Sequence, residues 1–579
     1  MILQELARLY NRLDAIESDG RRLVPKSGFS TERVSFCVVI DRDGALVAVE
    51  DIRDQTGAKP QALSIDVPQH TKRSGTGVSP FFLCDNSAYV LGASAKGNPK
   101  RTMSAFEACR EFHRAAAEGL PADTPLRAVS RFFASWDPAR AADLELIEEI
   151  VQGSNLVFRI DGMHSFVHES PDAVDAWRRI NASHAKQGEP TTCLVTGESA
   201  TPAMLHPAIK GVAGGNSSGT SIVSFNLSAF RSFGKEQGMN APVSESAAFR
   251  YVAALNYLTS SDLHRIRIAD TTTVFWAERE TRFENLFGVV MEGLDEAPDE
   301  ELRVNLLRMR DGKPLVGVDP DVRFFVLGLA PNAARLSVRF WLTDTVDAFA
   351  AGLGAHLADC AIERQHENEP ETIPIWRLLS ESARRYTGTG RDRKAINVDA
   401  NPKLAAGLIR AVLTGVAYPS GLLAAYVGRV RADREINYQR ASAIKAAITR
   451  TRRIRGMEEV TVSLDRQNVS VGYRLGRLFA ALERAQYAAL GDVNATIKDR
   501  YYGAASSTPA RVFPVLMRLS QHHIAKAQWG GGIERVIAEV VDGVDEFPAF
   551  LPLEEQGLFA IGYYHQRNAF FRKKDEQEE

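Results

Sequence analysis

Cysteine is scarce in this sequence: its 579 residues include only Cys37, Cys84, Cys109, Cys193 and Cys360. No two of them form a C-x-x-C pair and their number is odd, so we expect neither a disulfide scaffold nor a cysteine zinc site. Long apolar runs are also missing, and no stretch of about 18 apolar residues could cross a membrane. These absences are typical of a protein of the reducing cytoplasm with no membrane contact.

Motifs of the common catalytic classes are missing as well. The sequence has no H-E-x-x-H, no Walker A motif and no His-Asp dipeptide. Residues 215–219 match the G-x-S-x-G pattern of a hydrolase nucleophile elbow, which needs a strand before it and a helix after it. The residues that follow alternate like a strand, so a flexible loop is the better interpretation, and a serine hydrolase using Ser217 stays a minor alternative. We therefore expect no enzyme activity, no cofactor and no metal.

Composition is that of an ordinary globular protein. Hydrophobic residues make up 45% and charged residues 25% of the chain, and the formal net charge is −2. The length predicts two to four domains. With so little net charge, a surface that binds nucleic acid can arise only where positive charges are concentrated locally.

The pattern of elements predicts an α+β protein: a mixed α/β N-terminal region followed by a C-terminal α-helical bundle. Residues 34–52 and 79–92 each look like a β-hairpin, and residues 220–230 alternate like a strand. Residues 364–374 are polar and contain prolines, which is typical of a linker. Beyond them strands almost vanish and amphipathic helices follow. We expect three regions, at 1–145, 146–362 and 371–579.

A short basic loop is the first candidate for nucleic-acid binding. Lys72 and Arg73 lie between strand candidates in a stretch rich in Gly, Ser and Thr, beside Gln69 and His70. Such a loop combines cations, an amide and close backbone approach, which suits both phosphate contact and base-edge reading. An ordinary solvated loop is the alternative.

A second, larger basic segment spans residues 429–455. It has only two acids, Asp433 and Glu435, against many cations. The cations are Arg429, Arg431, Arg434, Arg440, Lys445, Arg450, Arg452, Arg453 and Arg455. A helix with such a stripe attracts a phosphate backbone. A solvated face of a bundle helix is the alternative, and we favour nucleic acid because so few acids accompany the stripe.

Several segments together resemble one family, the large subunit of the type I-C CRISPR Cascade interference complex. They are DNSAYVLG (85–92), CLVTGE (193–198), the long stretch from LHPAIKG to AALNYL (205–258), TTTVFWAE (271–278) and FFVLGLAPNAARLSVRFW (324–341). The similarity runs in order along essentially the whole chain. Its middle segment is long enough to make a chance match implausible.

The resemblance implies a non-catalytic subunit that binds CRISPR RNA and target double-stranded DNA. It would read the protospacer-adjacent motif on the duplex, help to open the strands and hold the displaced strand, while guide pairing carries most of the specificity. The partners implied are a repeated backbone subunit, a handle-processing subunit, a small subunit and a separate helicase-nuclease. A purely architectural subunit that binds RNA and protein but does not read DNA is the main alternative.

The resemblance also suggests residue roles. Gln69, Lys72, Arg73 and Ser74 are the candidates for contact with the adjacent-motif duplex, and the arginines and the lysine of residues 429–455 for the displaced strand. A further set lies in the long similar segment and would contact the nucleic-acid backbone: Asn216, Ser217, Ser218, Gly219 and Lys235. In this family the helical end can be made separately as a small subunit. We expect Met457 to be that internal start, with 457–579 as the short product.

Overall fold

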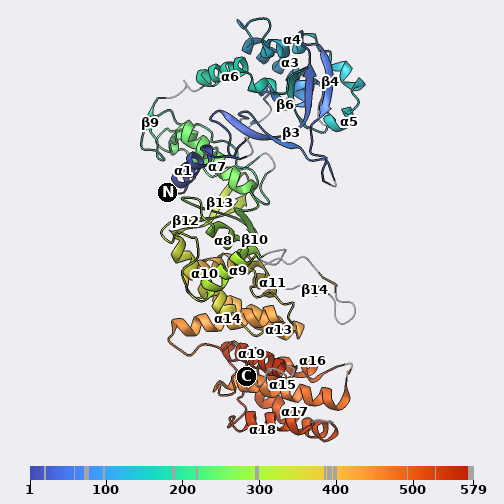
Figure 1. The fold of residues 1–579 in the computed structure, drawn as a ribbon, viewed down its shortest axis with the longest axis vertical. Helices are drawn as coiled ribbons and strands as arrows, with labels where there is room; N and C mark the ends of the chain where they lie inside the picture. The colour runs from blue at the N-terminus through green and yellow to red at the C-terminus, as the bar shows by residue number, and fades with distance from the viewer. Residues whose placement is uncertain are drawn as a thin grey trace. The chain divides into compact units, whose positions relative to one another are not determined.

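The computed structural model of the chain divides into two compact units, which are described one at a time (Figure 1). Unit 1 comprises Met1–Ser260 and Pro331–Ser337, and unit 2 comprises Ser261–Ala330 and Val338–Glu579. The described residues are 1–18, 21–57, 59–70, 73, 77–95, 98–184, 189–216, 219–293, 299–383, 386–387, 394–395, 401–491, 493, 495–527 and 530–571.

Unit 1 is built on a mixed sheet with helices. Its strands are β1 (Glu17–Ser18), β2 (Arg21–Arg22), β3 (Phe29–Ile40), β4 (Leu46–Asp51), β5 (Leu63–Pro68), β6 (Cys84–Asn86), β7 (Asn155–Ile160), β8 (Thr191–Thr192) and β9 (Ser199–Ala200). Its α-helices are α1 (Ile2–Asp14), α2 (Ser87–Val90), α3 (Pro99–Ala116), α4 (Pro125–Ser135), α5 (Ile147–Ile150), α6 (Pro171–His184) and α7 (Glu245–Ser260). Short 3-10 helices are η1 (Pro138–Asp143), η2 (Val167–Glu169), η3 (Ser228–Phe230) and η4 (Gln237–Asn240).

The long strand β3 organises the main sheet of unit 1. Its first half pairs with β5 and its second half with β4, both antiparallel, and its other edge pairs parallel with β7, which in turn pairs with β6. The predicted hairpin at residues 34–52 is confirmed by the β3–β4 pair. Strands β3 and β7 lie on either side of the predicted boundary at residue 145, yet they belong to one sheet.

Alternating side chains give this sheet two apolar faces. Phe36, Val38 and Ile40 of β3 belong to a large core that also contains residues of α3, α4 and α6. Cys37 and Val39 point into a smaller cluster on the opposite face. This is the period of two expected for a strand that is buried on both sides.

Unit 2 joins an antiparallel four-stranded sheet to a large set of helices. Its strands are β10 (Arg265–Ile268), β11 (Thr271–Ala277), β12 (Arg323–Asn332), β13 (Arg335–Thr345), β14 (Tyr386–Thr387) and β15 (Lys394–Ala395). Its helices are α8 (Phe283–Glu292), α9 (Glu300–Arg310), α10 (Val346–Cys360), α11 (Ile375–Glu381), α12 (Pro402–Thr414), α13 (Ser420–Asp433), α14 (Tyr438–Ile454), α15 (Val471–Leu490), α16 (Ile497–Ala505), α17 (Pro509–Lys526), α18 (Gly530–Val541) and α19 (Leu553–Phe571). The tip of the β12–β13 hairpin, residues 331–337, is assigned to unit 1.

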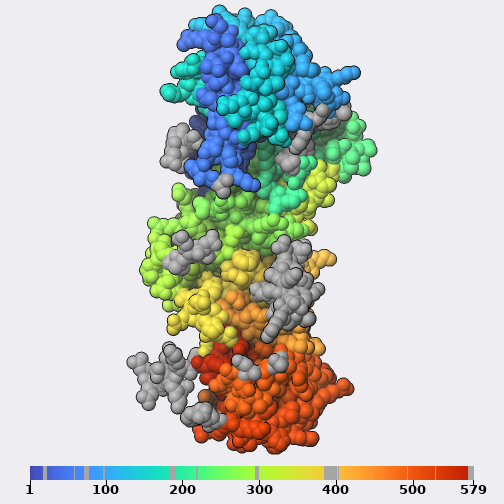
Figure 2. Space-filling model, turned by 90° about the vertical axis from the view of Figure 1, so that its right-hand side faces the viewer, coloured from blue at the N-terminus to red at the C-terminus, as the bar shows by residue number. Residues whose placement is uncertain are grey.

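One continuous apolar core runs through unit 2, from β11 and β12 to α19. Phe275 and Phe324 of the sheet pack on Phe287 of α8, with ring centroids 4.6 Å and 5.1 Å from it. Helices α15–α19 enclose an aromatic cluster around Phe559, whose ring centroid lies 5.5 Å from that of Tyr502. On the face shown in Figure 2 these orange-to-red helices form a continuous, closely packed surface. The α+β class with a helical C-terminal region is confirmed.

Two local predictions are wrong. Residues 79–92 do not form a hairpin, because Asn86 begins helix α2: its side-chain oxygen accepts the N–H of Ala88, as an N-cap does. Residues 220–230 do not form a strand either. Only isolated bridges at Thr220 and Ser221 and the short helix η3 are present there.

The segment predicted as a linker is packed into unit 2. The hydroxyl of Tyr438 donates to the carbonyl of Pro370 at 2.9 Å, and Ile373 is 4% exposed and belongs to the core of the unit. Met457 is 47% exposed in the connection between α14 and α15. The three predicted regions and the internal start at Met457 stay predictions.

Candidate nucleic-acid interfaces

The first predicted site lies in the connection between β5 and β6 of unit 1. The N–H of Gln69 donates to the carbonyl of Gly28 at 3.0 Å, and the N–H of His70 donates to Oγ of Ser30 at 3.0 Å. These bonds fix the start of the loop to the beginning of β3. Gln69 itself is half-buried. The predicted contacts Lys72 and Ser74 lie outside the described residues.

Arg73 is held inside an aromatic clamp. Its guanidinium carbon lies 3.8 Å from the ring centroid of Phe81 and 3.9 Å from that of Tyr89. Nε donates to the carbonyl of Ser79 at 2.8 Å, and Nη2 forms an ion pair with Asp85. Cation–π contacts contribute about 0.5–2 kcal/mol each. Arg73 therefore anchors the loop, and its DNA contact stays a prediction that requires the ion pair with Asp85 to open.

The partner carboxylate of Arg73 is almost completely buried. Asp85 is 1% exposed, and burial raises its pKa to about 6, although Arg73 and the N–H groups of Phe81 and Asn86 lower it. An unpaired charge at this depth is strongly unfavourable. The positive charge of Arg73 is therefore needed within the protein.

Glu32 of β3 links this loop to the chain segment that leads into the predicted backbone contacts at residues 216–219. Its Oε1 lies 3.8 Å from Nδ1 of His70, and its Oε2 lies 2.6 Å from Nζ of Lys210. Burial lowers the pKa of His70 to about 4, more than Glu32 raises it. Lys210, which the sequence analysis did not single out, leads into the Gly/Ser loop and is held by Asn256 of α7 through its N–H at 2.8 Å. Glu32 is thus a common anchor for the basic loop and for the segment that leads into the Gly/Ser loop.

The Gly/Ser loop at residues 215–219 is closed by backbone pairing of Ile209 with Thr220, at 2.9 Å and 2.8 Å. Gly219 has φ +89°, and a Cβ there would lie 2.6 Å from Cβ of Ala208, so only glycine fits. Asn216 is exposed, and Ser217 and Ser218 lie outside the described residues. No α-helix follows this loop within the described residues 219–244, which is not the setting of a nucleophile elbow.

The predicted basic stripe at residues 429–455 is spread over two helices and a turn. Helix α13 ends at Asp433, Arg434 adopts a left-handed conformation at φ 56°, and Asn437 caps α14. Three of the predicted cations are buried: Arg440 is 1% exposed, Lys445 2% and Arg450 2%. The expectation that these three face a displaced strand is wrong, because their partners lie inside the fold: acids for Arg440 and Arg450, and a backbone carbonyl for Lys445.

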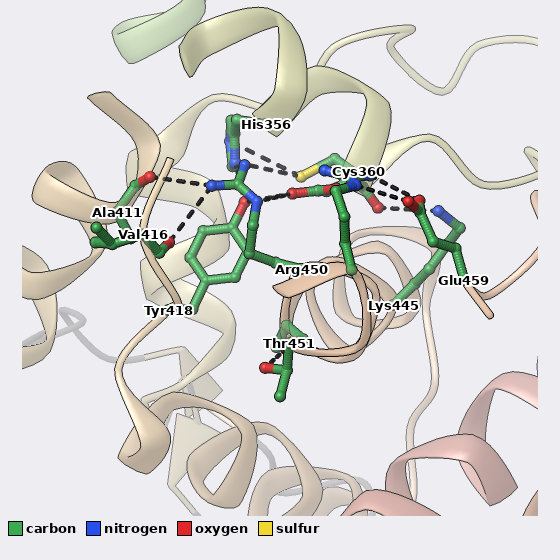
Figure 3. A network of polar contacts seen from close by, with 12 residues as sticks. His356, Cys360, Ala411, Val416, Tyr418, Lys445, Arg450, Thr451 and Glu459 are labelled. Atoms are coloured by element: carbon green, nitrogen blue, oxygen red, sulfur yellow. Dashed lines mark hydrogen bonds and ion pairs between the residues drawn. The ribbon is translucent and has the colours of Figure 1, made fainter. Parts of the chain in front are cut away.

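A buried network around Arg450 shows this pairing (Figure 3). Nε of Arg450 donates to Oδ2 of Asp359 at 2.5 Å, and Nη2 of Arg453 lies 2.7 Å from Oδ1 of the same carboxylate. Nζ of Lys445 donates to the carbonyl of Asp359 at 3.0 Å, and Nη1 of Arg450 donates to that of Ala411 at 3.1 Å. Burial raises the pKa of Asp359, and the two guanidinium groups lower it. The network joins α10 to α14.

The other cations of the segment differ in their partners. Arg440 pairs with the buried Glu381 at 3.1 Å and with Asp433 at 3.1 Å. Those with an acid partner nearer the surface are Arg429 with Asp433, Arg452 and Arg455 with Glu554, and Arg453 with Glu459. Arg431 and Arg434 are exposed and form no ion pair with a described residue. Only these two keep the predicted character of free surface cations.

Helix α17 carries a basic face that the sequence analysis did not single out. Its 18 residues include no Asp or Glu. Arg511, Arg518, His522 and Lys526 recur at spacings of seven, four and four residues and are exposed, so they form one stripe. The opposite face is buried and contains Val512, Phe513, Leu516 and Ser520.

The cations of this stripe lack ion-pair partners in the part of the chain that the structure describes. Arg511, Arg518 and Lys526 form no ion pair or side-chain hydrogen bond with a described residue. The pKa of His523 is lowered by burial first and then by the positive charges of His522 and Lys526. Unpaired cations without nearby acids on the same helix are what attracts a phosphate backbone. The stripe can be recognised from the sequence alone, because residues 509–526 contain cations at helical spacing and no acids.

No group of three or more His, Cys, Asp or Glu side chains in the described part of the chain is placed to hold a metal ion. No described helix is both long enough and apolar enough to cross a bilayer.

Comparison with known proteins places the chain in a family. A family model described as CRISPR-associated protein (Cas_Csd1) matches residues 6–571. A search of curated proteins found no match. Because the family match covers nearly the whole chain, both units are included in it. This chain belongs to the Cas_Csd1 family of CRISPR-associated proteins.

Proposed function

We propose that the chain is the large subunit of a type I-C CRISPR RNA-guided surveillance complex and has no catalytic activity of its own. In this role it binds CRISPR RNA and target double-stranded DNA, recognises the protospacer-adjacent motif, helps to open the strands and holds the displaced strand. Membership of a CRISPR-associated family supports a role in such a complex. The motif reading and the strand contacts rest on the residues discussed next.

The observation that carries the proposal is the stripe on α17. Arg511, Arg518 and Lys526 are exposed, form no ion pair with any described residue, and have no acidic neighbour on their helix. Surface arginines and lysines usually lie near acids, and most of those in residues 429–455 do. A row of cations that the protein does not neutralise internally suits a strand backbone, because each phosphate contact releases condensed counterions. We assign the displaced strand to α17, joined by Arg431 and Arg434.

The adjacent motif is assigned to the loop at residues 69–74. Its root is rigid, since the clamp around Arg73 and the bonds of Gln69 and His70 fix both of its sides. We keep Lys72 and Ser74 as the candidate contacts of this loop, because base-edge reading requires a rigid support. Lys210, 42% exposed beside the same anchor, adds a cation to this region.

The partners proposed are the repeated backbone subunit, the handle-processing subunit, a small subunit and a helicase-nuclease that the complex recruits. Residues 457–579 correspond to the small subunit, because α15–α19 share an aromatic cluster and Met457 is exposed in the connection before them. If Met457 is an internal start, intact-mass analysis of the expressed gene finds a second product that begins there. Full-length chain as the sole product contradicts this.

Two alternatives are distinguished by experiment. An architectural subunit would support the complex without reading DNA, so its loss would weaken binding to all targets equally. A serine hydrolase would need Ser217, and a Ser217→Ala variant with full antiviral activity dismisses it. The absence of a helix after residues 215–219, within the described part, disfavours the hydrolase.

The test is duplex binding by the reconstituted complex, with and without this chain, on targets that differ only in the bases beside the protospacer. The proposal expects that the chain makes affinity depend on those bases. A Lys72→Gln variant then loses duplex affinity, while a Lys59→Gln variant, which removes the same charge from the chain segment before β5, does not. Equal binding of both targets in the presence of the chain contradicts motif reading.

A further inference from the structure

Phe233 of unit 1 stands almost entirely in solvent. Its side chain is 97% exposed, and no other large apolar side chain among the described residues exceeds 77%. Scattered surface leucines and valines need no explanation, but an aromatic ring that touches almost nothing of its own protein does. The ring is therefore available in full to another molecule.

The turn that carries this ring is firmly built. Asn240 closes it, because its Oδ1 accepts the N–H of Ser232 at 3.0 Å and its Nδ2 donates to the carbonyls of Lys235 and Gln237 at 3.1 Å and 3.0 Å. Gly238 fixes the turn to the body of the unit: its N–H donates to the carbonyl of Met204 at 3.1 Å. Phe233 is thus presented by an ordered turn of residues 232–240.

Backbone strain is concentrated in the same turn. Phe233 has φ 51° and Gln237 has φ 45°, and both lie in the left-handed region that side chains with a Cβ disfavour. Gly238 also has no room for a Cβ, which would lie 2.0 Å from the carbonyl oxygen of Ala203. Strained residues that the surrounding structure holds in place are concentrated at ligand contacts. Phe233 therefore keeps its exposed position in a backbone conformation that a residue with a Cβ rarely adopts.

The residues next to Phe233 within the turn are polar and partly cationic. Lys235 is exposed, and its side chain has no ion pair or hydrogen bond with a described residue. Arg231 pairs with Glu236 at 2.9 Å, but both are more than half exposed, so solvent screens that pair. A protein-docking aromatic sits in an apolar, charge-poor patch. The neighbours of Phe233 in the turn are Arg231, Ser232, Gly234, Lys235, Glu236 and Gln237.

We propose that the turn of residues 232–240 is a base-stacking site for single-stranded nucleic acid. The ring of Phe233 stacks on an unpaired base, and Lys235, two residues along, contacts the adjacent phosphate. An aromatic platform beside a cation is how proteins hold single strands without reading their sequence. This assignment rests on the proposed function for its class of ligand and names the residue that takes a base.

The test uses the full chain and single-stranded oligonucleotides, one fully natural and one abasic at every position. Phe233→Ala is expected to weaken binding of the natural strand by roughly 5- to 150-fold, the range for loss of one stacked base. Phe233→Trp is expected to retain binding. The abasic strand is expected to bind both variants and the wild type alike, since it offers no base to stack on.

Matched controls separate stacking from other effects. Phe550→Ala removes another exposed ring, 71% exposed, in unit 2, and is expected to leave affinity unchanged.

The phosphate contact of the site is tested separately. Lys235→Gln is expected to lower the slope of log affinity against log salt by about 0.7.

Three outcomes overturn the proposal. If Phe233→Ala binds the natural strand as the wild type does, the ring takes no base. If Phe233→Ala fails to assemble with other subunits of the complex, the ring docks a protein. If the wild-type chain binds no nucleic acid at all, the proposed function fails together with this site.

Discussion

Arg450 donates a hydrogen bond from Nε to Oδ2 of Asp359 at 2.5 Å, and the two residues are 2% and 0% exposed. They lie 91 positions apart in the sequence. Arg450 belongs to the segment with the densest positive charge that we identified in the chain, yet its charge serves the packing of α10 against α14. High local charge in a sequence is therefore not the same as charge available to a ligand.

Removing the carboxylate of Asp359 should be strongly destabilising. In Asp359→Ala, the buried guanidinium of Arg450 loses its partner, and we expect a loss of about 3–5 kcal/mol in the free energy of unfolding. Urea unfolding of the full chain measures it. Asp319→Ala, which breaks the exposed pair with Arg279, is the control and should cost about 1 kcal/mol or less. Equal losses in the two variants would contradict the buried network.

A double-mutant cycle tests the clamp around Arg73. Arg73→Ala alone leaves the carboxylate of Asp85 buried without its cation, so we expect clear destabilisation. Adding Asp85→Asn removes that uncompensated charge. The double variant should be more stable than the sum of the single changes predicts, by about 1 kcal/mol or more. Strict additivity of the unfolding free energies would show that Arg73 does not pair with Asp85 in solution.

Acid should destabilise unit 1 through His113. Burial lowers the pKa of this residue to about 4, and its ring accepts the N–H of Leu83 at 3.0 Å while Nδ1 faces the carbonyl of Cys109 at 2.8 Å. Both contacts are satisfied by the neutral ring. In the unfolded state His113 binds a proton near pH 6.5. Its contribution to the free energy of unfolding is therefore present above that pH and is lost as pH falls towards 4.

For one group whose pKa is lowered this far, the loss in the free energy of unfolding is about 3 kcal/mol. A His113→Gln variant offers an acceptor and a donor but does not titrate. Its unfolding free energy should fall less than that of the wild type between pH 7 and pH 4.5, as measured by urea unfolding at each pH. Parallel pH profiles for the two proteins would show that His113 does not carry this dependence.

Much of the fold could be predicted from the sequence. The helices after residue 400 follow apolar residues at helical spacing, and the hairpin of β3 and β4 follows alternation around a turn at residues 41–44. The hairpin predicted around Asp85 and Asn86 was wrong because the residues that favour turns also cap helices. Only the tertiary context separates the two roles.

The candidate sites were less predictable, for a physical reason. A charge count along the sequence sees only near neighbours, whereas Arg450 pairs with Asp359 and Arg452 pairs with Glu554, 102 residues away. The clamp of Arg73 likewise depends on Tyr89, which comes after a whole strand. The stripe on α17 was different, since it needs no long-range information and only the helical period was required to find it.

The salt dependence of single-stranded DNA binding by an α17 variant of the full chain tests whether α17 holds the displaced strand. The variant replaces Arg511, Arg518 and Lys526 by Gln. The matched control replaces three exposed arginines whose charges are paired, and these are Arg282, Arg303 and Arg310 with Glu301, Glu300 and Asp311.

Each unpaired cation that contacts a single strand contributes about 0.7 to the slope of log affinity against log salt. For three contacts we expect the slope to fall by about 2 in the α17 variant and to stay near the wild-type value in the control. Equal slopes in the wild type and the α17 variant, or an equal fall in the control, would contradict the claim that α17 holds the displaced strand.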